Sequence, residues 1–548
     1  MALSAPAARV HLGLALSGGG FRAAAYHLGV LKRLEELGVL ARIEALSTVS
    51  GGSITGALYA LRCAQSGGAP GSYAVDELIV EIESLLLDNL RSRALLGTPR
   101  RALRTLRSMV SSRASRTGLI AEELDRRMFK GATLDQLPLW IAINATNLRT
   151  GKGWRFMADR AGDYLAGATD RTRGIRVADA VAASAAYPGL TDSYAFDTRW
   201  ERMRGDLLSE GRWERPPVER PGTVSRWRER YGAPSGSVRF QLVDGGLYDN
   251  EGVNALRGHK ITHVVISGAA PPEREYADGF GPARLLRIVE VVHDRLGATT
   301  RQLAHEMTHG VHPTEAATRL RLLGRSLRKT AASGVPGDVR EALTAAAAEA
   351  EALTAIGSPA RGVQFTACAQ VLLHRADLAR NMFAAPEDGG IDVPPRYRGL
   401  EPSLVSELSR VRTDLDALEA DVFELLIAQG YFVADLMVKQ AMPDVVCNGL
   451  PPAEWYAEGL APEWTRAHDI IQKANANQRI VAQQLIAAAA RVLPIGRLPV
   501  HSSAWRYTVN LLLITLPVAM LVLLAMGWLG YGVWRALAWL VGHLFTGA

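Results

Sequence analysis

Apolar and polar positions alternate in a regular way at the start of the chain. A short apolar run, Val10–Leu16, has the length of a buried strand. Apolar residues at helical spacing follow from Tyr26 to Leu37, and a second apolar run begins at Ile43 and leads into the helix-forming stretch Ile54–Ala64. The pattern therefore predicts a strand, a helix, a second strand and a second helix in this order.

The longest apolar segment lies near the C-terminus. Tyr507–Trp534 contains 28 residues without a charged side chain, whereas a helix needs about 20 apolar residues to cross a bilayer core. Aromatic residues lie near both of its ends, and Arg506 and Arg535 flank it. We expect one transmembrane helix at 507–534 and a short interfacial tail at 535–548. The alternative is a buried helix of a large soluble core.

The N-terminus carries no pattern of a secretory signal. The apolar stretch His11–Ser17 runs directly into a glycine loop and not into a cleavage site. Arg491, Arg497 and Arg506 precede the C-terminal apolar segment, and basic residues favour the cytoplasmic side of a membrane. We therefore expect a single-pass C-terminal anchor with the rest of the chain in the cytoplasm.

Composition excludes several classes of protein. Hydrophobic residues make up 48% and charged residues 21% of the chain, which excludes an intrinsically disordered protein. Cys63, Cys368 and Cys447 lie far apart and form no CxxC pair. This argues against a disulfide scaffold and against a cysteine-based zinc module. The net charge of +7 is compatible with binding to nucleic acid or to an anionic membrane.

The positive charge is concentrated in one segment. Between Asn89 and Ile120 there are eight arginines and no acidic residue, at positions 91, 93, 100, 101, 104, 107, 113 and 116. Three of them share a helical face that has two leucines beside it: Arg100, Arg104, Arg107, Leu103 and Leu106. Either this face binds anionic lipid or it is a solvated helical face. Nucleic acid is disfavoured, because no aromatic residue lies between the arginines.

A glycine-rich loop, Ser17–Arg22, connects the first predicted strand to the first predicted helix. Glycine allows successive N–H groups to point at one site, and the helix dipole adds about half a positive charge there. Such a loop binds a phosphate or the oxyanion of an acyl-transfer reaction. Gly18, Gly20 and Ala23 match the spacing of a dinucleotide-binding motif, but the second strand does not end in the acidic residue which that motif requires.

The second strand ends in Ser50, and small residues follow it. Thr48–Gly52 fits the nucleophile elbow G-x-S-x-G except for the threonine in the first position. A base for this serine could come from Asp244, which follows a strand predicted at Arg239–Val243 and precedes two glycines. Partial burial beside Ser50 would raise the pKa of this carboxyl towards a useful value. On its own, however, the same sequence is an ordinary Asp-Gly turn.

Taken together, these motifs resemble those of the patatin-like phospholipases. The matches in chain order are Ser17–Arg22, Thr48–Ser53, Ile143–Gly151, Val177–Gly189 and Asp244–Gly246. They cover Leu14–Asn250, and a looser likeness extends through Ile261–Ser267 and towards Arg412–Tyr431. The resemblance implies a three-layer α/β/α sandwich and a Ser–Asp dyad acyl hydrolase that needs no catalytic histidine, cofactor or metal.

The resemblance also implies a role for each matched residue. Ser50 is the nucleophile and Asp244 activates it. The oxyanion hole is assigned to Gly18, Gly19, Gly20 and Arg22, the arginine bracing the loop. Support of the elbow and of the aspartate loop is assigned to Gly51, Gly52, Gly245 and Gly246. Thr48 departs from the family pattern, and Asp249 is interpreted as structural.

We expect a catalytic core at 8–270, with a basic helical insertion around 85–130. A mostly helical segment at 271–500 would complete the catalytic domain. The expected substrate is a membrane phospholipid or lysophospholipid, and gating by self-association or by a regulatory partner is a further hypothesis. Two other functions stay open: a zinc peptidase that uses the HExxH motif His305–His309, and a non-catalytic membrane scaffold.

Overall fold

The computed structural model describes residues 10–108, 115–188, 191–205, 236–257, 261–269, 365–374, 382, 391–411 and 415–489. The predicted membrane span at 507–534, the tail at 535–548 and the HExxH motif at 305–309 lie outside these residues. Among the helices that are described, none combines the length and the apolar character needed to cross a bilayer.

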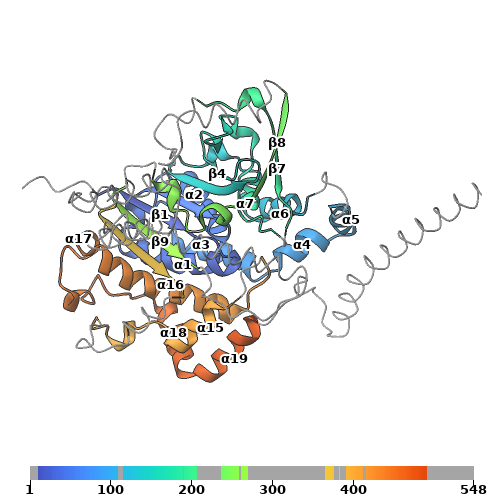
Figure 1. The fold of residues 1–548 in the computed structure, drawn as a ribbon. Helices are drawn as coiled ribbons and strands as arrows, with labels where there is room; N and C mark the ends of the chain where they lie inside the picture. The colour runs from blue at the N-terminus through green and yellow to red at the C-terminus, as the bar shows by residue number, and fades with distance from the viewer. Residues whose placement is uncertain are drawn as a thin grey trace, which may run out of the picture. The chain divides into compact units, whose positions relative to one another are not determined.

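A mixed sheet of ten strands forms the centre of the described structure (Figure 1). Its main path runs in the order β10-β9-β1-β2-β3-β4-β5-β6, and β8 pairs with both β3 and β7. The strands are β1 Leu12–Leu16, β2 Ile43–Val49, β3 Ile141–Asn147, β4 Lys152–Phe156, β5 Ala161–Asp163, β6 Gly167–Thr169, β7 Tyr194–Arg199, β8 Ser237–Asp244, β9 His263–Gly268 and β10 Ala367–Leu372. From β10 to β3 the pairs are parallel, and beyond β3 they are antiparallel.

β1 lies between two parallel neighbours and is buried along its whole length. Leu12, Leu14 and Leu16 face the large core on one side of the sheet, whereas Ala15 belongs to a smaller core on the other side. A strand covered on both faces reads as a continuous apolar run, which is why the sequence pattern locates this strand well. The prediction of an α/β fold is confirmed.

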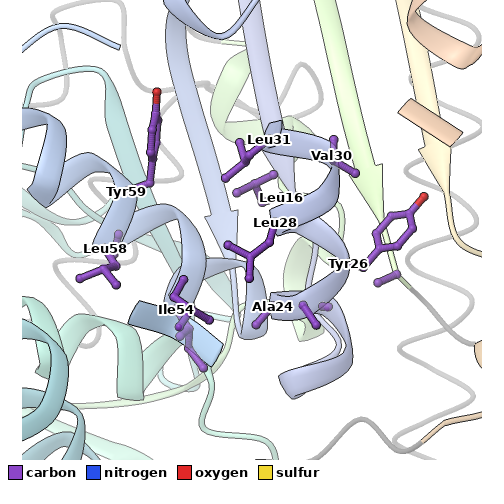
Figure 2. Close-up of a cluster of buried hydrophobic side chains, with 14 of the residues drawn as sticks. Leu16, Ala24, Tyr26, Leu28, Val30, Leu31, Ile54, Leu58 and Tyr59 are labelled. Atoms are coloured by element: carbon purple, nitrogen blue, oxygen red, sulfur yellow. The ribbon is translucent and has the colours of Figure 1, made fainter. Parts of the chain in front are cut away.

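The described helices are α1 Gly20–Glu36, α2 Gly51–Gln65, α3 Val75–Leu86, α4 Leu90–Leu96, α5 Pro99–Ser108, α6 Arg116–Leu124, α7 Val177–Ser184, α9 Gly246–Asp249, α10 Val253–Leu256, α15 Pro402–Ser409, α16 Ala420–Ala441, α17 Pro443–Val446, α18 Thr465–Ala476 and α19 Gln478–Ala489. On the face of the large core, Leu28 and Leu31 of α1 and Ile54 and Leu58 of α2 gather around Leu16 (Figure 2). On the other face, Val253 and Leu256 of α10 join the smaller core.

The C-terminal helix α16 packs along α1 in the same layer (Figure 1). Two glycines allow their backbones to touch. A Cβ on Gly29 would lie 1.8 Å from the carbonyl oxygen of Ile427, and a Cβ on Gly430 would lie 2.3 Å from that of Tyr26. Since β10 also joins the edge of the sheet beside β9, residues after 365 complete the domain that the N-terminal half begins.

Candidate active site

Ser50 stands between the end of β2 and the start of α2, in a backbone conformation of φ 50° and ψ −118°. A positive φ is costly for a residue with a Cβ, and strain of this kind occurs at functional sites. The turn leaves no room for larger neighbours, because a Cβ on Gly51 would lie 2.0 Å from the carbonyl oxygen of Gly20. A Cβ on Gly52 would lie 2.5 Å from that of Leu16. This geometry is that of the predicted elbow.

The sheet register brings Asp244 to Ser50. β2 and β8 pair along the same edge of β3, and β4 pairs along the other edge. β2 ends with Val49 opposite Asn144, and β8 ends with Asp244 opposite the next residue, Ala145. The two strand ends therefore face each other end to end, and Ser50 lies close enough to Asp244 to lower the pKa of its carboxyl. The serine and the aspartate are predicted from segments almost two hundred residues apart, and the fold places them in contact.

Burial sets the basicity of the Asp244 carboxylate. Its side chain is buried, and the loss of hydration raises its pKa from 3.8 to about 6. The nearby Ser50 hydroxyl and the N–H of Gly246, which donates to Oδ1 at 2.8 Å, act in the opposite direction and lower the pKa. A carboxylate of this basicity accepts a proton from a serine more readily than an exposed aspartate does, yet it is mostly ionised at neutral pH.

Not every N–H group of the glycine loop is available to bind an oxyanion. The N–H of Gly18 donates to the carbonyl of Asn250 at 3.0 Å, so the expected set of three oxyanion donors is reduced. A Cβ on Gly18 would lie 2.4 Å from Oδ1 of Asn250, so that side chain would have to move for any other residue to fit there. No acceptor among the described residues is assigned to the N–H groups of Gly19 and Gly20. Gly19 precedes α1 and Gly20 is its first residue, beside the turn that carries Ser50.

Arg22 has a different role from that of an oxyanion donor. Its buried guanidinium donates to the carbonyls of Ser409 at 2.6 Å, Val411 at 2.9 Å and Ala269 at 2.5 Å. These hydrogen bonds tie the first turn of α1 to the end of β9 and to the chain that follows α15. Arg22 therefore braces the loop from behind.

Ser184, at the end of α7, is a residue to which the sequence analysis assigned no role. Its Oγ donates to the carbonyl of Asn144 at 2.5 Å and accepts the N–H of Ser50 at 2.8 Å. It also lies 2.9 Å from Oγ of Ser53. One hydroxyl thus holds the elbow, the central strand β3 and the start of α2 together. The only signal in the sequence is its position inside the stretch Val177–Gly189.

Thr48, which departs from the family pattern, fits the elbow because other residues make room for it. Its Oγ1 accepts from Ser53 at 3.0 Å and donates to the carbonyl of Ala142 at 3.3 Å. Its methyl group occupies space next to Gly56, where a Cβ would lie only 2.4 Å away. The side chain is therefore part of the support of the turn.

His27 is a second supporting residue that the sequence analysis did not identify. Its Nε2 donates to the carbonyl of Ser17 at 2.9 Å, and its Nδ1 therefore accepts from Oγ of Ser267 at 2.7 Å. Burial lowers the pKa of this imidazole to about 4, so it is neutral at physiological pH. It fixes Ser17, the first residue of the glycine loop.

The loop that follows Asp244 is held by the carboxylate of Asp249, which belongs to the loop itself. Asp249 accepts the N–H of Gly252 at 3.0 Å and that of Asn254 at 2.7 Å, and burial raises its pKa. It thus closes the turn into α10. Gly245 is required because a Cβ there would lie 2.4 Å from the carbonyl oxygen of Asn144.

A comparison with protein-family models finds a match in the N-terminal half of the chain. Residues 14–257 match the family model described as patatin-like phospholipase. No curated protein matches the chain.

Solved structures with weak similarity to the chain are also found. Human GIVD cytosolic phospholipase A2 is 14% identical with a TM-score of 0.34, over 52% of this chain and 48% of its own, so the chain spans about half its length. VipD from Legionella pneumophila is 14% identical with a TM-score of 0.24, over 86% of this chain and 91% of its own. The family-model match covers less than half of the chain and shows that residues 14–257 are similar to a patatin-like phospholipase domain.

Proposed function

We propose that the chain is a membrane-anchored lipid acyl hydrolase of the phospholipase A or lysophospholipase type, with Ser50 as nucleophile and Asp244 as general base. The observation that carries the proposal is the strained turn of Ser50 beside the buried carboxylate of Asp244, whose pKa is raised to about 6. A strained serine at a strand–helix turn paired with such a base is arranged for acyl transfer.

In the first half of the reaction, Oγ of Ser50 attacks the ester carbonyl carbon while its proton passes to Asp244. The carbonyl oxygen becomes an oxyanion, which the N–H groups of Gly19 and Gly20 and the N-terminus of α1 stabilise. When the tetrahedral intermediate collapses, the C–O bond to the alcohol breaks, and the proton held by Asp244 goes to the leaving oxygen. The products are the free alcohol and an acyl-Ser50 ester.

In the second half, a water molecule gives its proton to Asp244 and attacks the acyl carbon. The new oxyanion occupies the same site, and its collapse breaks the bond to Oγ. The serine recovers its proton from Asp244, and the fatty acid leaves. Asp244 serves as base and then as acid in both halves, so one carboxyl group is sufficient.

The apolar segment Tyr507–Trp534 supports a membrane location for this activity. A charge-free segment of 28 residues is long enough for one span, and the arginines before it favour a cytoplasmic catalytic domain. An enzyme held at the bilayer has its substrate at high local concentration, which favours phospholipids over soluble esters.

The test is fatty acid release from phospholipid bilayers by the purified full chain, together with labelling by a fluorophosphonate, which phosphonylates activated serines. We expect Ser50→Ala to abolish both signals and Asp244→Ala to reduce both by at least about 10³-fold. The matched controls are Ser66→Ala, at the exposed end of α2, and Asp197→Asn, on the exposed edge of β7. Both variants should retain activity.

Hydrolysis that survives Ser50→Ala would overturn the proposal. A zinc peptidase would instead lose peptide cleavage on chelation and on replacement of His305 or His309. A scaffold would show neither hydrolysis nor labelling.

A further inference from the structure

The fold neutralises most of the arginine-rich segment. Five of its eight arginines form ion pairs with carboxylates: Arg91 with Asp416, Arg93 with Asp88, Arg101 with Glu123, Arg104 with Glu122 and Arg116 with Asp192. These carboxylates all lie outside the basic segment, three of them within three residues of its ends and two of them, Asp192 and Asp416, far along the chain. Arg104, which the sequence analysis placed on a basic helical face, is 2.8 Å from its partner. The segment as a whole is therefore not a free basic surface.

One face of α5 carries two arginines that take no part in these ion pairs. Arg100 and Arg107 are exposed, and neither has a carboxylate partner in the part of the chain that the structure describes. Between them, Leu103 and Leu106 are 49% and 50% exposed. Residues three or four apart lie next to each other on a helix, so these four side chains share one outward face. The opposite side is fixed to the protein by Thr105, which donates to the carbonyl of Leu95 at 2.8 Å.

This face is mechanically connected to the active site. α6, which packs on α5, begins at Arg116. The N–H and Nε of Arg116 donate to the carboxylate of Asp192 at 2.9 and 3.0 Å. Asp192 follows Thr191, whose N–H donates to the carbonyl of Tyr187 at 3.1 Å, and the carbonyl of the neighbouring Ala186 accepts the N–H of Asp244 at 3.0 Å. These hydrogen bonds link the start of α6 to the residue proposed as the base.

We propose that the outward face of α5, formed by Arg100, Leu103, Leu106 and Arg107, docks on a bilayer that contains anionic phospholipid. Guanidinium groups bind phosphate in a bidentate manner, and leucines on the same face can enter the boundary between headgroups and acyl chains. The inference rests on the proposed function, because docking here would bring the rim of the Ser50 site to the membrane that holds its substrate.

The composition of the face selects a lipid surface over the alternatives. A solvated helical face gains nothing from two half-exposed leucines side by side. A second copy of the chain would have to offer carboxylates to two unpaired arginines, whereas the acidic residues around α5 are already engaged by Arg101 and Arg104. Anionic headgroups above an apolar layer satisfy both kinds of side chain at once.

Insertion is measured on the full chain without catalysis. In a Ser50→Ala, Cys368→Ser background, Leu103→Cys is labelled with an environment-sensitive dye, since the other two cysteines are buried. The protein is placed in bilayer discs of phosphatidylcholine with or without phosphatidylserine and with lipids that carry a quencher. The matched control is Ile480→Cys on α19, a residue 60% exposed.

We expect a blue shift and strong quenching at position 103 in discs with phosphatidylserine, and neither at position 480. Arg100→Glu with Arg107→Glu should reduce the quenching at position 103 at least about five-fold. Equal signals at 103 and 480 would overturn the proposal. So would a blue shift that needs no lipid and grows with protein concentration, because that result would assign the face to self-association.

A second measurement separates docking from catalysis in the Ser50 enzyme. Arg100→Glu with Arg107→Glu should slow hydrolysis of anionic bilayers about ten-fold or more and leave hydrolysis of a soluble short-chain ester unchanged. Arg173→Glu with Arg199→Glu, two arginines whose side chains are 91% and 59% exposed elsewhere on the surface, is the charge-matched control. Unchanged bilayer hydrolysis would contradict the docking face, whereas an inactive parent enzyme would contradict the proposed function alone.

Discussion

Nη2 of Arg33 lies 2.7 Å from Oδ1 of Asp435, and both side chains are almost fully buried. The pair joins α1, which follows the glycine loop, to α16, four hundred residues later in the chain. Lys439 approaches the same carboxylate oxygen at 2.7 Å, so Asp435 lies between two buried cations, of which Arg33 also pairs with Glu36 at 2.8 Å. The support of the active site therefore depends on a charged residue near the C-terminal end of the domain.

Asp435→Asn should destabilise the domain strongly. The substitution keeps the shape of the side chain but leaves the Lys439 ammonium buried without its counter-charge and the Arg33 guanidinium with Glu36 alone, and breaking such a buried pair costs about 3–5 kcal/mol. Chemical unfolding followed by tryptophan fluorescence measures the loss. Asp421→Asn, at the exposed start of the same helix, should change stability by less than about 0.5 kcal/mol. Equal effects of the two substitutions would show that the buried pair contributes nothing specific.

Gly29→Ala should prevent α1 and α16 from packing. A methyl group at this position would lie 1.8 Å from the carbonyl oxygen of Ile427, and backbone cannot yield as a flexible side chain does. We expect a loss of at least about 3 kcal/mol, seen as a large fall in melting temperature. Gly174→Ala is the control, because a Cβ there meets nothing within 4 Å. A normal melting temperature of Gly29→Ala would mean that the two helices are not in backbone contact.

Asp244→Asn should abolish catalysis but stabilise the protein above pH 6. The pKa of this carboxyl is about 6 in the folded protein against an ordinary 3.8, so the folded state binds the proton more tightly than the unfolded state. The stabilising effect of that proton is complete below about pH 4 and is lost as pH rises through 6. Replacing the ionised group with a neutral amide should therefore raise stability by about 1–3 kcal/mol at pH 8 and have little effect at pH 4. Melting curves at the two pH values test this, and a lower stability of Asp244→Asn at pH 8 would contradict it.

The rate of hydrolysis should depend on pH through the same group. Asp244 acts as a base only when it is ionised, so kcat/KM should fall about ten-fold per pH unit below an apparent pKa near 6. The measurement uses a soluble ester between pH 4 and pH 8, in order that lipid charge does not change. An activity that is flat down to pH 4 would exclude this carboxylate as the base.

Ser184→Ala should lower kcat more than it changes KM. Without the Oγ, the N–H of Ser50 and the carbonyl of Asn144 lose a shared partner in a buried position, which costs about 1–3 kcal/mol. We expect kcat to fall about ten-fold or more, because the elbow is held less firmly while the lipid-binding surface is intact. Ser193→Ala, which removes a hydroxyl bonded to Gln241 on the neighbouring strand, should leave kcat almost unchanged. A larger effect of Ser193→Ala than of Ser184→Ala would contradict the assignment.

Several features of the site are predictable because they are local. A short apolar run followed by glycines and a helix defines β1, the oxyanion loop and α1 within about thirty residues. The same holds for the elbow at Ser50, where the small residues that follow the serine are required by the turn itself. Asp244 could be identified in the same way, as a strand end followed by glycines.

Other features could not be read from local patterns. Gly18 looked like an oxyanion donor, but its N–H is used by Asn250, and nothing near Gly18 in the sequence indicates this partner. Ser184 is one small residue in a run of alanines, yet it connects three elements at the dyad. The arginine-rich segment is basic by composition, and only the fold shows that carboxylates outside the segment neutralise five of its charges.

The sequence by itself therefore determined the α/β class of this protein, its strand–loop–helix units and the two residues proposed as the dyad, because periodicity and glycine placement act over a few neighbouring residues. The tertiary structure decided which amides are free, which arginines keep their charge and which helix closes the domain. Each of these depends on groups that are distant in sequence and meet only in the sheet and its helical layer. Their hydrogen bonds, desolvation and shifted pKa values arise because the fold brings these groups together, and no local sequence pattern predicts them.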